Sequence, residues 1–274
     1  MEVKQKVDSC VRQIREKTDF VPKVALILGS GLGALADEIE REMIVDYHEI
    51  KGFPVSTVSG HKGRFIFGHI GETPVVIMQG RVHYYEGYSM SDVVLPVRVM
   101  RELGAQILFL TNAAGGISQI LEPGDLMLLT DQISTFVPSP LIGQNVDEWG
   151  PRFPSMDTIY DVALRDQIRS VAKSHQILLK EGIYLQTTGP NYESPAEVKM
   201  FSMLGAHAVG MSTSVEAMCA RHMGMRVCGI SCITNMAGGT AERPLSHKEV
   251  SEIADRTAPL FKKLVTETIK QLSD

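Results

Sequence analysis

The chain has 274 residues, of which 44% are apolar, and 27 basic and 32 acidic residues give it a net charge of −5. This length fits one large domain, which we expect to cover residues 1–274. The charges form no basic block and no apolar run approaches the roughly 20 residues of a membrane span, so we expect neither a nucleic-acid partner nor a membrane. The amino terminus lacks the apolar core of a signal peptide, and the four cysteines are unpatterned. Both features predict a cytoplasmic protein.

Apolar residues at helical spacing predict a helix over residues 2–18, and the apolar run Val24–Leu28 is typical of a strand buried on both faces. Similar runs predict strands at 65–70, 75–78, 107–110, 126–129, 206–209 and 227–233. Helices are expected at 91–103, 161–179, 195–204, 214–223 and 246–272. This alternation predicts an α/β fold with a mixed, largely parallel sheet flanked by helices on both faces. Residues 137–158, which are rich in Pro, Gly and Asn, are expected to form a functional or disordered loop.

A glycine-rich turn follows the first predicted strand and has three interpretations. Gly29-x-Gly31-x-x-Ala34 fits a dinucleotide-binding fingerprint that opens a helix, with Asp46 or Glu49 as the carboxylate on the ribose. It also fits a plain tight turn. In the third interpretation, backbone N–H groups and the Ser30 hydroxyl hold a phosphate. The motif alone does not choose among the three.

Basic side chains follow another strand, in the sequence Gly80-Arg81-Val82-His83. Residues two apart on an extended segment face the same side, so Arg81 and His83 can converge on one oxyanion. A solvated pair at a sheet edge is the alternative. His61, in a glycine-flanked loop, adds a potential donor. Together with the glycine-serine turn, these residues suggest an oxyanion pocket.

A second group of residues suits a flat heterocycle. Tyr192 and Glu193 lie in a Gly-Pro turn just before a predicted helix, and Asn235 follows the strand 227–233. Glu193 and Asn235 have the donors and acceptors to hold the edge of a purine, while Tyr192 packs on its face. Alternatively, Glu193 only stabilises the start of a helix.

The ordered motifs along nearly the whole chain resemble the trimeric purine nucleoside phosphorylase family of the inosine and guanosine type. The matching segments are Leu28–Gly33, Gly60-His61, Gly80–His83, Tyr85–Gly87, Thr111–Gly116, Gly189-Pro190-x-x-Glu193, Gly210–Ser212, Thr234-Asn235 and His247. The resemblance implies a distorted barrel-like core in the sheet. It also implies phosphorolysis of purine ribonucleosides and deoxyribonucleosides to the free base and the sugar 1-phosphate.

The resemblance also implies roles for individual residues. A phosphate site would comprise Ser30, His61, Arg81, His83, the backbone at Ala113, and Ser212. The ribose would contact Tyr85, Met211 and His247, and the purine would contact Tyr192, Glu193 and Asn235. Asn235, Glu193, His83 and His247 would be the catalytic residues. The family is similar in forming homotrimers in which one aromatic side chain reaches the neighbouring subunit's site, and Trp149 occupies that position here.

One departure concerns the base site, where Met236 replaces the lysine of animal relatives. Glu193 with Asn235 resembles the version that prefers 6-oxopurines, and the absence of nearby aspartates disfavours a methylthioadenosine phosphorylase, the nearest competing assignment. The residues are also compatible with a nicotinamide-dependent oxidoreductase, a nucleoside-binding protein without turnover, or a hydrolase. We expect no metal and no organic cofactor, with inorganic phosphate as a second substrate.

Overall fold

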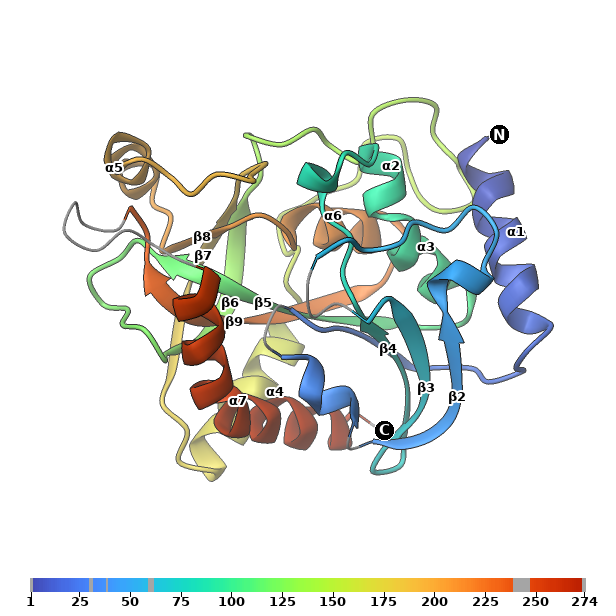
Figure 1. Ribbon diagram of the computed structural model, residues 1–274, viewed down its shortest axis with the longest axis horizontal. Helices are drawn as coiled ribbons and strands as arrows, with labels where there is room; N and C mark the ends of the chain where they lie inside the picture. Colours follow the sequence, from blue (N-terminus) through green and yellow to red (C-terminus); the bar gives the residue numbers. More distant parts are fainter. Residues whose placement is uncertain (1, 30–31, 38, 59–61, 239–246, 273–274) are drawn as a thin grey trace.

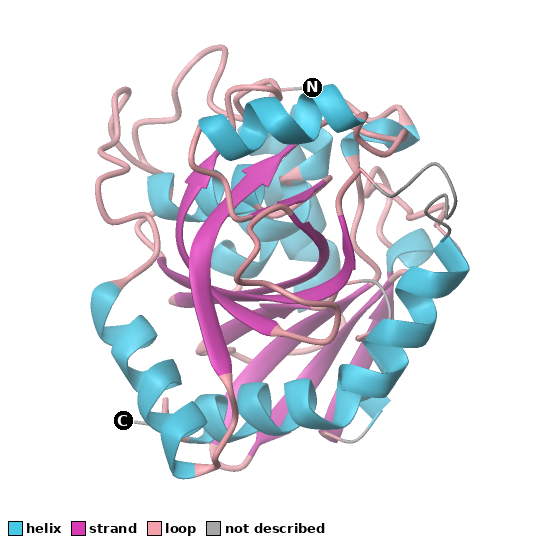
Figure 2. Cartoon of the chain, turned by 90° about the vertical axis from the view of Figure 1, so that its left-hand side faces the viewer, coloured by secondary structure: helices cyan, strands magenta, loops and turns pink. Residues whose placement is uncertain are grey.

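The computed structural model describes residues 2–29, 32–37, 39–58, 62–238 and 247–272. The strands in these ranges belong to one mixed sheet with helices on both faces (Figures 1 and 2). The α-helices are α1 (Val3–Arg15), α2 (Met90–Val93), α3 (Leu95–Glu102), α4 (Val162–Ser174), α5 (Pro195–Met203), α6 (Ser214–His222) and α7 (His247–Lys270). The strands are β1 (Val24–Ile27), β2 (Glu40–Asp46), β3 (Arg64–Ile70), β4 (Thr73–Gln79), β5 (Ile107–Gly116), β6 (Leu126–Ile133), β7 (Leu179–Gln186), β8 (Ala208–Gly210) and β9 (Arg226–Met236). Three short 3-10 helices are η1 (Gly33–Asp37), η2 (Tyr47–Glu49) and η3 (Tyr84–Glu86).

The sheet consists of an open part joined to a closed, barrel-like part. Its strand order is β2-β3-β4-β1-β5-β8-β7-β6-β9, and β9 also pairs with β5. The last pairing closes a ring from β5 through β8, β7, β6 and β9 back to β5. Parallel pairs join β1 to β4 and β5, β5 to β9, and β7 to β6 and β8. The predicted α/β fold with a mixed sheet and a barrel-like core is therefore confirmed.

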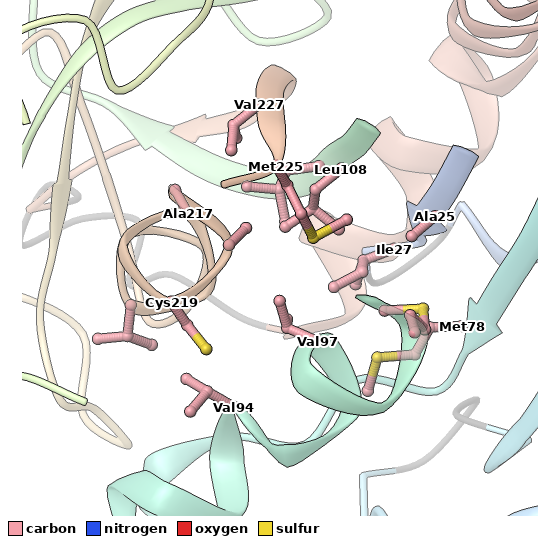
Figure 3. Packing of buried hydrophobic residues seen from close by; sticks show 14 of the residues in the cluster. Ala25, Ile27, Met78, Val94, Val97, Leu108, Ala217, Cys219, Met225 and Val227 are labelled. Carbon is pink, nitrogen blue, oxygen red and sulfur yellow. The ribbon is translucent and has the colours of Figure 1, made fainter. Parts of the chain in front are cut away.

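Each face of the sheet carries its own hydrophobic core, as β1 illustrates. Ala25 and Ile27 belong to the core beneath α1, α3 and α6, whereas Val24 and Leu26 belong to the core beneath α4 and α7. Because side chains alternate along a strand, β1 is buried on both faces, as predicted. Figure 3 shows the first core, in which Val97 of α3 and Cys219 of α6 pack among side chains of the sheet.

The sequence predicts no strand at β2 or at β7, although Tyr184 and Leu185 in the second half of β7 are fully buried. β2 is an edge strand that pairs only with β3, and most of its side chains are exposed or half-buried. β7 contains Lys180, Glu181 and Gly182, residues that disfavour a strand assignment. The predicted helix 91–103 is also divided into α2 and α3. Pro96, in the first turn of α3, has no N–H to continue the α2 ladder.

The glycine-rich turn does not open an α-helix, so the dinucleotide interpretation is wrong. The described residues after the turn form η1 and then β2, which runs antiparallel to β3. The strand–helix–strand unit that a dinucleotide site needs is therefore not built here. The two carboxylates proposed to bind a ribose have other partners. Asp46 pairs with β3 in the β2–β3 ladder, and Glu49 forms an ion pair with Lys17 at 2.9 Å.

Gly29 has a packing role in this arrangement. A Cβ at this position would lie 2.6 Å from the Asn112 Cα, so only glycine lets the end of β1 approach β5 so closely. The Gly29 N–H donates to the Thr111 hydroxyl at 3.0 Å. Within the described ranges, no helix is long and apolar enough to cross a membrane.

Candidate active site

The cleft lies where β5 changes partners. β1 pairs with β5 as far as Leu110, and β8 pairs with it only from Gly115 onward. Residues 111–114 therefore have a strand on one side only, at β9. Ligands in α/β sheets bind at such switch points. The cleft found here has a volume of about 130 Å³, and residues 112–115 line it.

Arg81 forms one wall of the cleft and is fixed by two buried acceptors. It follows β4 and is only 1% exposed. Its Nε donates to the Glu216 Oε1 at 2.9 Å, and its Nη1 donates to the Thr111 carbonyl at 2.8 Å. The Thr111 carbonyl accepts this second bond just beyond Leu110, where the pairing of β5 with β1 ends. Glu216 neutralises the charge of Arg81 and holds the guanidinium in one orientation.

His83 lies beside Arg81 in the cleft and pairs with Glu86. Its Nδ1 is 3.1 Å from the Glu86 Oε1, and burial, reinforced by Arg81, lowers the pKa of His83. Burial acts to raise the pKa of Glu86, but hydrogen bonds from His83 and Thr57 outweigh it and lower that pKa to about 2. An ionised carboxylate only accepts, so Nδ1 carries the proton and Nε2 is the acceptor nitrogen of the neutral ring. Tyr85 stacks on this ring at 4.8 Å, and burial raises its pKa to about 12.

The amino end of α6 borders the same side of the cleft. Ser212 lines the cleft two residues before the helix, and its hydroxyl is 3.1 Å from that of Thr213. Thr213 is fully buried with φ +85°, a strained conformation for a β-branched residue. Asn112 holds it through a hydrogen bond from Nδ2 to the Thr213 Oγ1 at 3.0 Å. The Ser212 hydroxyl and Arg81 together suit an oxyanion, whereas the Ser214 and Val215 N–H groups of α6 already donate to the Ser212 carbonyl and the Gln186 Oε1.

The other side of the cleft carries the aromatic ring and the carboxylate predicted for a heterocycle. Tyr192 and Glu193 both line it. Burial raises the pKa of Glu193, and the Thr187 hydroxyl, donating to the Glu193 Oε1 at 3.1 Å, opposes this shift. The turn before them requires Gly189, where φ is +63° and a Cβ would lie 2.4 Å from the Met211 sulfur. Met211 also lines the cleft.

Asn235 owes its position to a bulge in β9. Ala114 is opposite Ile233, but the next residue, Gly115, is opposite Asn235, so Thr234 is the extra residue. The Thr234 hydroxyl donates to the Asn235 Oδ1 at 3.0 Å, and the Asn235 Nδ2 donates to the Met236 carbonyl at 3.2 Å. Both bonds orient the amide at the edge of the cleft.

The cleft gathers most of the residues singled out in the sequence. Those lining it are Arg81, His83, Tyr85, Ala113, Tyr192, Glu193, Met211, Ser212 and Asn235. Ser30 and His61 lie outside the described residues. His247 is the first residue of α7, and its side chain is likewise outside the description. The functional roles of these residues stay predictions.

Trp149 lies away from the cleft, inside its own chain. It is 8% exposed, its Nε1 donates to the Glu102 Oε1 at 2.8 Å, and the Arg98 guanidinium lies 5.0 Å from its ring centroid. It belongs to loop 137–158, which contains neither helix nor strand, as expected. A contribution to a neighbouring subunit stays a prediction.

Three residues that hold site side chains in place were not identified from the sequence: Glu216, Thr187 and Thr234. Glu216 is 135 residues from Arg81 and lies inside a helix, so its pairing leaves no local signal. Thr234 and Glu86 stand close to predicted residues, and this nearness in the sequence is the only local hint of their roles. Among the described residues, no group of three or more His, Cys, Asp or Glu side chains is placed to hold a metal ion.

Comparisons with known proteins agree with this architecture. The model of the phosphorylase superfamily matches residues 23–270. Purine nucleoside phosphorylase 1 of Geobacillus stearothermophilus is 46% identical over 267 residues, which cover 97% of either protein. The purine nucleoside phosphorylase of Mus musculus is 42% identical over 94% of this chain and 92% of its own. The structure of Schistosoma mansoni purine nucleoside phosphorylase in complex with inosine has a TM-score of 0.92 at 37% identity and covers 97% of this chain and 96% of that one.

These matches cover almost the whole chain at identities well above those that show a fold alone. The chain therefore belongs to the phosphorylase superfamily. Within that superfamily it is a member of the purine nucleoside phosphorylase family, whose enzymes are pentosyltransferases.

Proposed function

We propose that this protein cleaves purine nucleosides with a 6-oxo group, such as inosine and guanosine, by attack of inorganic phosphate. The products are the free base and ribose 1-phosphate or its deoxy form. One observation carries the proposal: the same cleft is lined by an oxyanion-binding pair, Arg81 and His83, and by a base-edge set, Glu193 and Asn235. A nucleoside lying between the two sets would have its glycosidic bond beside the phosphate.

The oxyanion-binding pair, Arg81 and His83, suits a phosphate that stabilises positive charge on the ribose and then attacks it. Arg81 is held in place by Glu216, so its fork is oriented before phosphate arrives. The neutral His83 ring can accept a hydrogen bond from the P–O–H group of phosphate at its Nε2. Ser212 and the N–H of Ala113 supply further donors, as do Ser30 and His61 by the family resemblance. Tyr85, Met211 and His247 would enclose the ribose.

The base-edge set suits a leaving purine that gains negative charge. Asn235 can hydrogen-bond to base nitrogen N7, and this bond strengthens as the base leaves. Ionised Glu193 accepts from N1–H, which a 6-oxopurine has and adenine lacks. This difference supports the proposed preference. The related Schistosoma mansoni enzyme has been solved both with inosine and with adenosine, so preference must be measured for this chain.

The proposed reaction needs no metal or organic cofactor, because the nucleophile is phosphate and the charges are handled by side chains. The proposal also includes a cytoplasmic homotrimer in which Trp149 or its loop borders the neighbouring cleft. Sedimentation velocity tests this assembly. An active monomer would contradict it.

The decisive experiment measures uric acid from inosine in a xanthine-oxidase-coupled assay, with and without phosphate. We expect activity only with phosphate, and saturation by phosphate should weaken in Arg81→Ala. Equal activity without phosphate would instead identify a hydrolase. Adenosine and methylthioadenosine, followed by base release, test the substrate preference. Faster cleavage of either would overturn the 6-oxopurine assignment.

A further inference from the structure

A second cavity, of about 270 Å³, lies apart from the cleft. It is bounded by α1, α2, α3, α6 and loop 137–158, and none of its lining residues lines the cleft. Figure 1 shows these helices gathered on the side of the sheet opposite α4 and α7. The volume is slightly below the roughly 300 Å³ at which pockets for drug-sized molecules begin.

Arg98 of α3 lines this cavity and is only 5% exposed. Its Nη2 is 3.3 Å from the Pro140 carbonyl and its Nη1 is 3.5 Å from the Ser91 hydroxyl, both long for hydrogen bonds. Its Nε is buried with no hydrogen-bond partner. Within the described part of the chain, Arg98 also forms no ion pair. A buried guanidinium in this state lacks the anion that would compensate its desolvation.

The acidic groups near the cavity are already engaged elsewhere. Glu102 accepts the hydrogen bond from Trp149, Asp92 pairs with Lys6, and Glu148 pairs with Lys4. Burial raises the pKa of the Cys219 thiol, and the charge of Arg98 and a hydrogen bond with it oppose this shift, so Cys219 gives Arg98 a neutral partner but no compensating charge.

His222 completes the set of titratable groups that line the cavity. Burial lowers its pKa and the charge of Arg98 adds to that shift, so His222 is neutral near pH 7. The cavity thus carries one uncompensated positive charge.

The rest of the lining is mostly apolar. The Trp149 ring lies 5.0 Å from the Arg98 Cζ, and Val3, Met90 and Leu141 line the cavity beside it. One guanidinium matches one negative charge, whereas a phosphate dianion would bury a second charge without a partner. We infer that this cavity is a second binding site, for a small organic carboxylate that sets its oxygens on Arg98 and its apolar body against Trp149.

The chain's single tryptophan lines this site, and it also belongs to the loop proposed to border the neighbouring cleft. Titrating the whole protein with benzoate should give a saturable change in Trp149 fluorescence. The neutral isostere benzamide and inorganic phosphate should give none at the same concentrations. Hypoxanthine saturates the clefts in every titration, so that the fluorescence change reports benzoate in the second cavity alone.

Two variants test the role of Arg98. Arg98→Gln should weaken benzoate binding tenfold or more, the size expected for losing a charge-assisted hydrogen bond. Gln144→Glu places a carboxylate at the exposed rim of the cavity and should weaken binding severalfold. Gln271→Glu makes the same charge change at the exposed carboxyl-terminal end and should leave binding unchanged.

The far-ultraviolet circular dichroism spectrum and the thermal unfolding midpoint verify that each variant is folded. If Arg98→Gln does not fold, Gln144→Glu decides the question alone. The inference is overturned if benzoate causes no saturable change in the unaltered protein. It is equally overturned if benzamide binds as well as benzoate, or if folded Arg98→Gln or Gln144→Glu retains full affinity.

Discussion

Arg81 and Glu216 form an ion pair that is almost wholly buried, with Nε and Oε1 2.9 Å apart and both side chains 2% exposed. The pair joins the segment that follows β4 to α6, and Arg81 is the partner that lines the cleft. Because each charge is desolvated, the partners depend on each other far more than the partners of a surface ion pair do.

Replacing Glu216 should therefore cost stability. We expect Glu216→Ala to lower the free energy of unfolding by about 3–5 kcal/mol, because it leaves Arg81 buried without an anion. Saturating phosphate should restore part of this loss. Urea denaturation with and without phosphate measures both effects. Glu181→Ala, which breaks an exposed ion pair with Arg169, is the control and should cost about 1 kcal/mol or less.

Glu86 should make stability depend on pH in acid. Its pKa is lowered from 4.5 to about 2, so the folded state binds its proton less readily than the unfolded state does. The stabilisation is thus complete above pH 4.5 and disappears as the pH falls toward 2. The difference in unfolding free energy between the unaltered protein and Glu86→Gln should shrink over this range. A difference that stays constant from neutral pH down would refute the assignment.

Glu193 should set the acid limit for inosine. Its pKa is raised by burial, and the ionised carboxylate is a stronger acceptor for the N1–H of a 6-oxopurine than the protonated form is. As the pH falls through this raised pKa, kcat/KM for inosine should fall. Thr187→Val removes a hydrogen bond that favours the carboxylate, so the same limb should move to higher pH. Glu193→Gln should have a low kcat/KM for inosine, and the decrease at acid pH should be absent from its pH profile.

Asn235 should act on the chemical step. We expect Asn235→Ala to lower kcat by about a hundredfold to a thousandfold, typical for removing one donor aimed at developing charge, with little change in the phosphate KM. Thr234→Val keeps the amide but removes the hydroxyl that orients it, so its loss should be smaller. Steady-state kinetics with phosphate varied at saturating inosine separate the two constants. A rise in phosphate KM alone would remove Asn235 from the base site.

Much of this architecture follows from local patterns. β1 and β5 are apolar runs buried on both faces, and the unusual residues at strand ends, such as Arg81 and Asn235, lie in one cleft because parallel strands end at one edge. The family motifs supplied the remaining site residues, among them Met211, and the barrel-like closure of the sheet.

Other features depend on contacts that no local pattern records. Glu216 would ordinarily face solvent on a helix, and only its approach to Arg81 makes its burial favourable. β2 is an edge strand, so one partner and few buried side chains suffice. Gly29 matches a dinucleotide-binding fingerprint in sequence only. In the structure a glycine is required there because the backbone of Asn112 lies too close for a side chain.

The extra residue in β9 also determines which side chains of this strand face the core and which face the cleft. Ile233 packs into the core beneath α1, α3 and α6, while Asn235, two positions later, faces the cleft. In a regular strand these two would share a face. The bulge therefore places the Asn235 amide in the cleft. If Thr234 were paired in regular register instead, the sequence would be unchanged and yet the amide would turn to the same side as Ile233.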